Sequence, residues 1–297
     1  MNPVPRLVFA ATVAALSGSV FAQPGTLSAR PDTFSAQQRV PPPPESAPAT
    51  PPYADYADLI LAAPVIVDAN IHGTTRLKGP DAVGVAPGTA RLYVEADVTA
   101  LIRGDTPLPP RIAYVLDVPV DAQGRLPKLR KQRVLLFARP VAGNPALLQL
   151  VRPDAQRNWT PGGDSLTRRI TQEILATEAP PRVTGVGNAF HVAGDLPGAG
   201  ETQIFLTTAD NRPVSLTIQR RQGEQPSWSL ALSDVVGEST PPPAANTLLW
   251  YRLACALPAE LPDSSVAALE ASDAQTARED YQLVIRSLGP CDRGGAL

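Results

Sequence analysis

The sequence predicts a β-rich α+β fold, in which an OB-like five-stranded β-barrel is followed by a β-meander domain with two C-terminal helices. Short segments that alternate apolar and polar side chains recur between residues 53 and 235, and Gly, Pro, Asn and Asp turn signals separate them. The first five of these segments follow one another without an intervening helical pattern, which is typical of a small barrel. Spacing near 3.6 residues occurs beside Ser165 and again near the C-terminus.

The N-terminal residues 1–22 have the pattern of a secretion signal. Arg6 precedes a mostly apolar run, and Val20 and Ala22 place small residues at the positions that signal peptidase accepts. No comparable apolar run follows, so we expect no transmembrane segment in the mature chain and a periplasmic or secreted protein. Residues 23–52 contain few large apolar residues and a run of four prolines, which predicts a disordered, proline-rich tether.

Residues 53–157 form the predicted barrel domain. Its expected strands are residues 59–67, 90–102, 112–118, 132–139 and 146–151. The first of them joins two apolar runs, 59–61 and 65–67, across Ala62-Ala63-Pro64. Turn signals occur at residues 79–80, 104–105, 121–124 and 143–145, between the strands. Five short strands with these connections are the basis for the OB-like prediction.

Residues 158–181 are predicted to contain a linking helix, with Asp164 or Ser165 as its N-cap and Pro180-Pro181 after its end. The second domain, residues 182–297, should then supply strands at 182–192, 202–208, 214–220 and 228–235. Two helices are expected after them: one at 247–256 capped by Asn246, and one at 274–288 that ends at Gly289.

The chain has two cysteines, Cys255 and Cys291, and we predict that they form a disulfide. An even number of cysteines in an exported protein is most simply explained in this way. Closing a loop of about 36 residues would stabilise the fold by roughly 4 kcal/mol in the chain-entropy model. The bridge would therefore fasten the two terminal helices to each other.

Composition excludes several functional classes. The formal net charge is −2, and the densest basic stretch, residues 125–133, contains no aromatic residue, so we expect no nucleic-acid partner. The chain has two histidines, no Cys-x-x-Cys and no His-Glu-x-x-His motif, and its glycines do not form a phosphate-binding loop. We therefore predict no metal site and no cofactor.

Two candidate groups of catalytic residues remain. The segment Gly163-Asp164-Ser165-Leu166 resembles the nucleophile block of the GDSL esterases and lipases, and that resemblance implies a serine hydrolase with Ser165 as nucleophile. A helix cap explains the same four residues, because no strand pattern precedes them and no Asp-x-x-His block follows. His191 could act as a general base oriented by Asp195, or it could be a strand-end residue with one hydrogen bond.

The densest charge in the chain is the basic run at residues 125–133. Its five cations are Arg125, Lys128, Arg130, Lys131 and Arg133, and it contains no acidic residue. It lies in a predicted loop between strands, where it could bind an anionic component of the cell envelope or simply be a solvated loop. We interpret the protein as a non-catalytic, envelope-associated binding or accessory protein whose partner is such a component or another envelope protein; the alternative is the hydrolase with Ser165 and His191.

Overall fold

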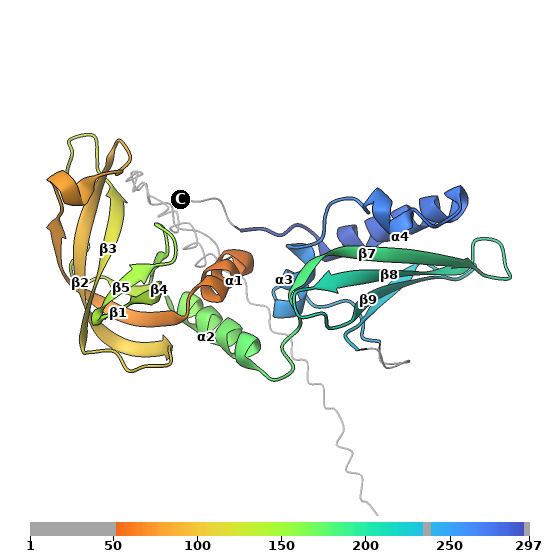
Figure 1. The fold of residues 1–297 in the computed structure, drawn as a ribbon, viewed down its shortest axis with the longest axis horizontal. Helices are drawn as coiled ribbons and strands as arrows, with labels where there is room; N and C mark the ends of the chain where they lie inside the picture. The colour runs from red at the N-terminus through yellow and green to blue at the C-terminus, as the bar shows by residue number, and fades with distance from the viewer. Residues whose placement is uncertain (1–51, 234–238, 294–297) are drawn as a thin grey trace, which may run out of the picture. The chain divides into compact units, whose positions relative to one another are not determined.

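The computed structural model describes residues 52–233 and 239–293 of the chain. In these residues a closed, mixed five-stranded β-barrel is followed by an antiparallel four-stranded sheet with helices (Figure 1). The predicted β-rich fold class is therefore confirmed. The expected signal peptide and, apart from Pro52, the expected tether lie outside the described residues. No helix in the described residues is long and apolar enough to cross a membrane.

The barrel consists of β1 (Val65–Arg76), β2 (Thr89–Arg103), β3 (Arg111–Pro119), β4 (Arg133–Val141) and β5 (Asn144–Leu150). A short 3-10 helix, η1 (Gly79–Ala82), connects the first two. Neighbouring strands pair antiparallel except β3 and β5, which are parallel, and the pairing of β1 with β4 closes the barrel. A further short strand that the sequence did not predict, β6 (Gln156–Asn158), pairs with β4.

The inner core of the barrel is formed by alternate side chains of each strand, because successive side chains of a strand point to opposite faces. In β2 the buried side chains are Ala90, Leu92, Val94 and Ala96, while the residues between them are more exposed. In β4 the run at 134–138 is buried throughout, because alternate residues face the barrel interior and a second apolar cluster that includes Phe137. Tyr114 fills the barrel, and its hydroxyl donates a hydrogen bond to Gln156 at 2.6 Å.

The predicted extended segment at 59–61 was wrong, because these residues belong to helix α1 (Tyr53–Ala62). Tyr53, Tyr56 and Ile60 recur at helical spacing and are buried on one face. The strand pattern begins only after Pro64, and β1 then runs to Arg76. A short apolar run does not distinguish a buried strand from a buried helix face, which explains the error.

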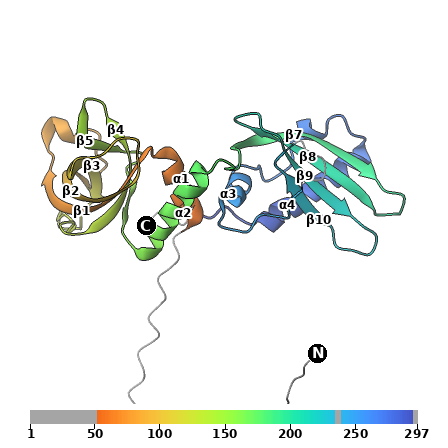
Figure 2. The same cartoon turned by 90° about the horizontal axis from the view of Figure 1, so that it is seen from below.

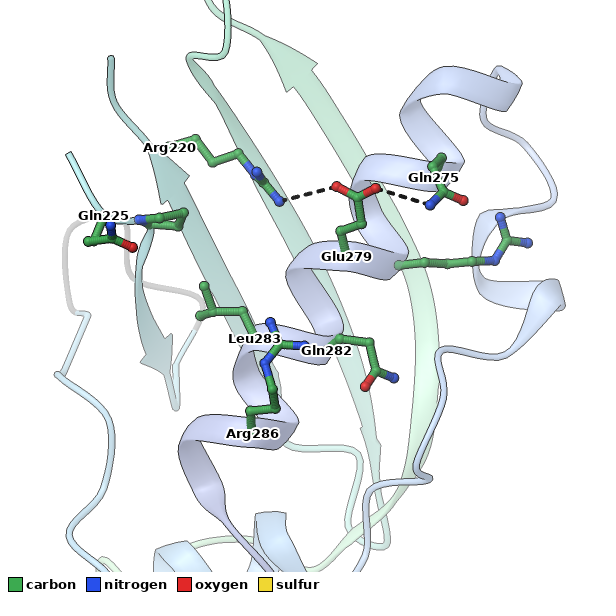
Figure 3. A pocket seen from close by; sticks show the side chains of 9 residues that line it. Arg220, Gln225, Gln275, Glu279, Gln282, Leu283 and Arg286 are labelled. Carbon is green, nitrogen blue, oxygen red and sulfur yellow. Dashed lines mark hydrogen bonds and ion pairs between the residues drawn. The ribbon is translucent and has the colours of Figure 1, made fainter. Parts of the chain in front are cut away.

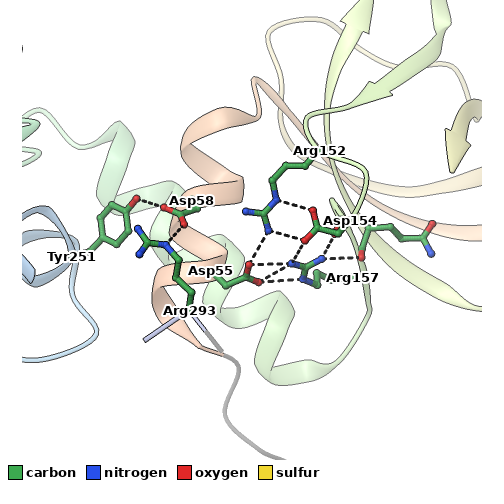
Figure 4. Close-up of polar contacts among 8 residues, drawn as sticks. Asp55, Asp58, Arg152, Asp154, Arg157, Tyr251 and Arg293 are labelled. Atoms are coloured by element: carbon green, nitrogen blue, oxygen red, sulfur yellow. Dashed lines mark hydrogen bonds and ion pairs between the residues drawn. The ribbon is translucent and has the colours of Figure 1, made fainter. Parts of the chain in front are cut away.

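Two carboxylates hold α1 in place (Figure 4). Asp55 accepts hydrogen bonds from Arg152 at 2.9 Å and from Arg157, while Asp58 accepts from the Tyr251 hydroxyl. The Nε of Arg293 also donates to Asp58, at 2.7 Å. The first described helix is thus connected to residues near the far end of the described chain.

Helix α2 (Pro161–Leu175) confirms the predicted helix but not its predicted cap. The N-cap is Thr160, whose Oγ1 accepts a hydrogen bond from the Gly163 N–H at 3.0 Å, and Pro161 occupies the first helical position. A Thr-Pro start satisfies one free N–H and sets the first φ angle, so the helix begins before Asp164 and Ser165. Those two residues therefore lie inside the helix.

The second sheet is a meander of β7 (Val183–Ala193), β8 (Gly200–Thr208), β9 (Val214–Arg220) and β10 (Ser227–Ala231). All three pairings are antiparallel. The last strand is shorter than predicted, and Val235 lies outside the described residues. Figure 2 shows the four strands side by side, with α4 (Ala271–Leu288) behind them.

Helix α3 (Leu248–Ala254) precedes α4, and a short 3-10 turn, η2 (Asp263–Val266), lies between them. The predicted cap of α3 was wrong: the Thr247 hydroxyl accepts the capping hydrogen bond from the Trp250 N–H, and Asn246 has a left-handed φ of 62°. An N-cap residue usually has an extended backbone, which Thr247 has and Asn246 does not. Helix α4 ends at Gly289, whose φ of 71° suits glycine.

The predicted disulfide between Cys255 and Cys291 is confirmed, with their Cα atoms 5.1 Å apart. Cys255 is the C-cap of α3 and Cys291 follows α4, so the bridge fastens the ends of the two helices. Apolar side chains of both helices pack with the strands, among them Leu253, Ala277 and Tyr281.

Candidate functional site

A cationic cleft lies between α4 and the end of β9 with the turn that follows it (Figure 3). Its volume is about 560 Å³. The lining residues are Arg220, Gln225, Pro226, Gln275, Arg278, Glu279, Gln282, Leu283 and Arg286. Among them are three guanidinium groups, three amides and one carboxylate, so the lining residues taken alone carry a net positive charge. Two carboxylates outside the lining, Asp280 and Asp263, pair with Arg220 and Arg278.

The outer face of α4 supplies most of this lining. Gln275, Glu279, Gln282 and Arg286 recur at intervals of three and four residues, which places them on one face of a helix. The opposite face, which includes Tyr281, is buried against the sheet. The amphipathic pattern that folds the helix onto the sheet thus also gathers the polar side chains at the cleft.

Arg220 is held by a fully buried carboxylate. Its Nε donates to Asp280 Oδ1 at 2.6 Å, and the other oxygen of Asp280 accepts from the Thr202 hydroxyl at 2.5 Å. Asp280 and Thr202 are both 0 % exposed. A buried carboxylate is tolerated only when it is paired and hydrogen-bonded, so Asp280 fixes the position of Arg220 at the edge of the cleft.

The hydrogen bonds continue from Thr202 to His191. Thr202 Oγ1 lies 2.9 Å from His191 Nδ1. Since the single hydroxyl proton of Thr202 is donated to Asp280, its oxygen accepts from the Nδ1–H of His191. A chain of four polar groups therefore runs across β7, β8, α4 and β9, from His191 to Arg220. In the described residues no hydrogen bond joins His191 to Asp195.

The other two arginines of the cleft are held more loosely. Arg278 donates to Asp263 at 2.8 Å, and that aspartate is 94 % exposed at its side chain. Arg286 is exposed and has no hydrogen-bond or ion-pair partner among the described residues. Glu279 accepts from Gln275 at 3.0 Å and lies 3.8 Å from Arg220. The site can present guanidinium donors to an anion.

The basic run at 125–133 is arranged differently from the prediction of five free cations. Arg125 pairs with Asp121 at 2.6 Å, and Arg133 makes two hydrogen bonds to the buried Asp68. The guanidinium of Arg133 also stacks over the Trp159 ring, 3.9 Å from its centroid. Two of the five predicted binding residues are therefore engaged within the fold.

Lys128, Arg130 and Lys131 are exposed and have no ion pair in the part of the chain that the structure describes. The loop itself is anchored by the buried Leu129 and by two backbone hydrogen bonds, one from the Lys131 N–H to the Ile71 carbonyl and one from the Ile71 N–H to the Gln132 carbonyl. Asp121 organises the start of the loop, and the pKa of its carboxyl is lowered mainly by the Arg125 backbone N–H and then by the Arg125 side chain.

The GDSL-like segment lies in the first turns of α2, whereas His191 lies on β7. Ser165 is an exposed residue within the first turns of α2, and no hydrogen bond links it to His191 in the described residues. Asp164, its neighbour, binds Arg168 at 3.0 Å. Strand β6 does precede the helix, but it has three residues at the edge of β4.

Residues that the sequence analysis missed make up most of the cleft and its support: Arg220, Arg278, Arg286, Thr202 and Asp280. Arg220 ends a strand whose alternation was recognised, and the polar positions of the terminal helix fall at the spacing of one face. These two patterns predict that α4 has a polar face. They do not predict that this face lies beside the end of β9. Within residues 52–233 and 239–293, no group of three or more potential metal ligands lies together.

Comparison of the chain with protein-family models and with curated proteins finds no match.

Proposed function

We propose that the protein is an exported, non-catalytic binding module of the cell envelope that holds an anionic ligand in the cationic cleft between α4 and β9. The observation that carries the proposal is the convergence of Arg220, Arg278 and Arg286 on one pocket that contains a single carboxylate. Its volume of about 560 Å³ lies within the range of small-molecule sites.

The chemistry of the lining favours a ligand with a phosphate or carboxylate group. Guanidinium groups are planar and donate two parallel hydrogen bonds to such anions, which gives both affinity and orientation. Arg220 is already fixed by Asp280, so little of its side-chain freedom would be lost on binding. Arg286 has its donors free, and the amides of Gln225, Gln275 and Gln282 can bind the neutral parts of the ligand.

Binding to phosphatidylglycerol vesicles, with phosphatidylcholine vesicles as the uncharged control, tests the proposal. The variant Arg278→Gln/Arg286→Gln removes two cations from the cleft but keeps Arg220, whose loss would leave Asp280 unpaired. We expect its affinity for the anionic vesicles to fall about tenfold or more, since each arginine lost from an anion site costs on the order of 1 kcal/mol. Glycerol 3-phosphate should compete with the vesicles for the native protein.

The matched control is Lys128→Gln/Arg130→Gln, which removes the same charge from the exposed loop. It should retain most of the affinity if the cleft is the site. An equal loss of vesicle affinity in both variants would show that binding depends only on the net charge of the protein. A loss confined to the loop variant would assign binding to the basic run. Either outcome overturns the cleft proposal. The proposal would also be overturned if the native protein bound neither phosphatidylglycerol vesicles nor glycerol 3-phosphate.

Export is a separate part of the proposal and has its own test. The small residues at Val20 and Ala22 place the expected cleavage before Gln23. N-terminal sequencing or intact mass of protein recovered from outside the cytoplasm should give a chain that starts at Gln23. Recovery of a membrane-bound chain that retains Met1 would contradict this.

A further inference from the structure

A second pocket, the proline pocket, lies at one end of the barrel and has a volume of about 440 Å³. Three segments form it: the start of β1 with the residue before it, the loop between β2 and β3, and the turn between β4 and β5. The lining residues from the first and third of these segments are Pro64, Val65, Pro140, Val141, Gly143, Asn144 and Pro145. The loop between β2 and β3 adds Asp105, Thr106, Pro107 and Leu108.

The walls of this pocket are aliphatic and stiff. Four prolines contribute rings that fix φ and lack an N–H, and two valines are restricted at χ1. The lining contains no aromatic ring. Such walls offer few donors to a peptide backbone or a sugar, and they cannot easily collapse onto themselves. Both properties favour a saturated hydrocarbon as the occupant.

The charged residue in the lining of the proline pocket determines which head group a bound ligand can carry. Among the lining residues of the described chain, Asp105 is the one that ionises, and it is exposed and has no ion-pair partner in that part of the structure. A carboxylate at this position repels an anionic head and attracts a cationic one. The preference is therefore opposite to that of the cationic cleft.

We propose that the proline pocket binds the alkyl chain of a ligand whose head group is cationic or neutral. An apolar cavity of about 150 Å³ accepts benzene, so a pocket of this size has room for a chain of about ten carbons. Each buried methylene group should strengthen binding by up to about fourfold. Affinity should thus rise with chain length and should be greater for a cationic head than for an anionic one.

The probe for this site is N-phenyl-1-naphthylamine, a neutral apolar dye whose fluorescence increases when it leaves water. We expect the native protein to bind it and decyltrimethylammonium, below its micellar concentration, to displace it at a lower concentration than decanoate. Octyltrimethylammonium should need a higher concentration than the decyl compound. Absence of dye binding, or stronger displacement by decanoate, would overturn the proposal.

Two variants and one control localise the effect. Thr106→Trp fills the pocket from an exposed loop position and should weaken dye binding tenfold or more, whereas Thr75→Trp, at an exposed position of β1 outside the pocket, should not. Asp105→Asn should abolish the preference of decyltrimethylammonium over decanoate in displacing the dye. Equal dye binding by both tryptophan variants would place the dye elsewhere, and a preference that survives Asp105→Asn would contradict the assigned charge.

Discussion

The basic run of the barrel and the cationic cleft of the second sheet are built on a similar pair of residues. In each, an arginine binds an aspartate that is 0 % exposed: Arg133 with Asp68, and Arg220 with Asp280. The remaining cations differ in their placement. In the cleft they line one pocket, whereas in the basic run they project from an exposed loop. Cations that are adjacent in sequence therefore do not form the more enclosed site.

The two buried aspartates also divide their hydrogen bonds differently. Asp68 receives both of its hydrogen bonds from Arg133, at 2.9 and 2.6 Å, and that guanidinium is stacked on Trp159. Asp280 shares its oxygens between Arg220 and Thr202. The first pair links the start of β4 to β1 within the barrel, while the second pair belongs to a chain of polar groups that ends at the cleft. This difference can be tested at several levels.

The largest expected effect separates the two aspartates directly. Asp280→Ala should lower the free energy of unfolding by about 3–5 kcal/mol, because it leaves both Arg220 and the buried Thr202 hydroxyl without their partner. Asp68→Ala should cost less, since the Arg133 side chain is 39 % exposed and can return to water. Urea unfolding of both variants measures this. An equal loss of unfolding free energy in the two variants would show that the hydrogen bond from Thr202 to Asp280 does not contribute to stability.

Removing the disulfide should affect the cleft more than the loop. Cys255→Ser/Cys291→Ser should cost about 2–4 kcal/mol, the usual range for a native bridge. Because Cys291 follows α4, amide hydrogen exchange should increase more in α4 and β9 than in β1 and β4. Uniform acceleration across both regions would mean that they unfold as one cooperative unit.

A smaller effect is expected at the start of α2, which follows the Trp159 that supports Arg133. Thr160→Ala should cost about 1 kcal/mol because Thr160 is the N-cap, and Ser165→Ala should cost nearly nothing because that serine is exposed inside the helix. Thermal unfolding compares the two. Covalent labelling of Ser165 by a fluorophosphonate probe would revive the hydrolase interpretation.

The smallest effect is a local response of the basic run to acid. The Asp121 pKa is lowered in the folded chain by the Arg125 N–H and side chain, so this stabilisation is complete above the ordinary aspartate pKa near 4 and is lost as the pH falls through the lowered value. The amide resonances of Gln123 and Arg125 should shift in that range. Asp121→Ala should abolish the shift, and its persistence would assign the titration to another group.

The fold was predictable because its signals are local. Alternation and short apolar runs located the strands of both sheets except β6, and the cysteine count predicted the disulfide. The errors concern competing local patterns: the apolar face of α1 resembled a strand, and the Thr-Pro start of α2 was overlooked beside Asp164 and Ser165. Caps are decided by single hydrogen bonds, so nearby residues of the same type are hard to distinguish.

The cleft could not be predicted in the same way. Arg220 and Asp280 are 60 residues apart, and Thr202 and Asp280 are 78 apart. Their contact depends on how α4 lies across the meander, which no local pattern specifies. The basic run was conspicuous because it is contiguous, but the acids that neutralise two of its arginines, Asp68 and Asp121, lie outside it.

The bonds of Asp58 bear on the order in which the protein can fold. Its partners Tyr251 and Arg293 are 193 and 235 residues away along the chain. Contacts of such long sequence separation close late, because the entropy of the intervening chain opposes them. Helix α1 can form early and dock through Asp55 and its buried face, but the bonds of Asp58 can close only after Tyr251 and Arg293 are in place. Loss of those residues should therefore be detected first at the opposite end of the described chain.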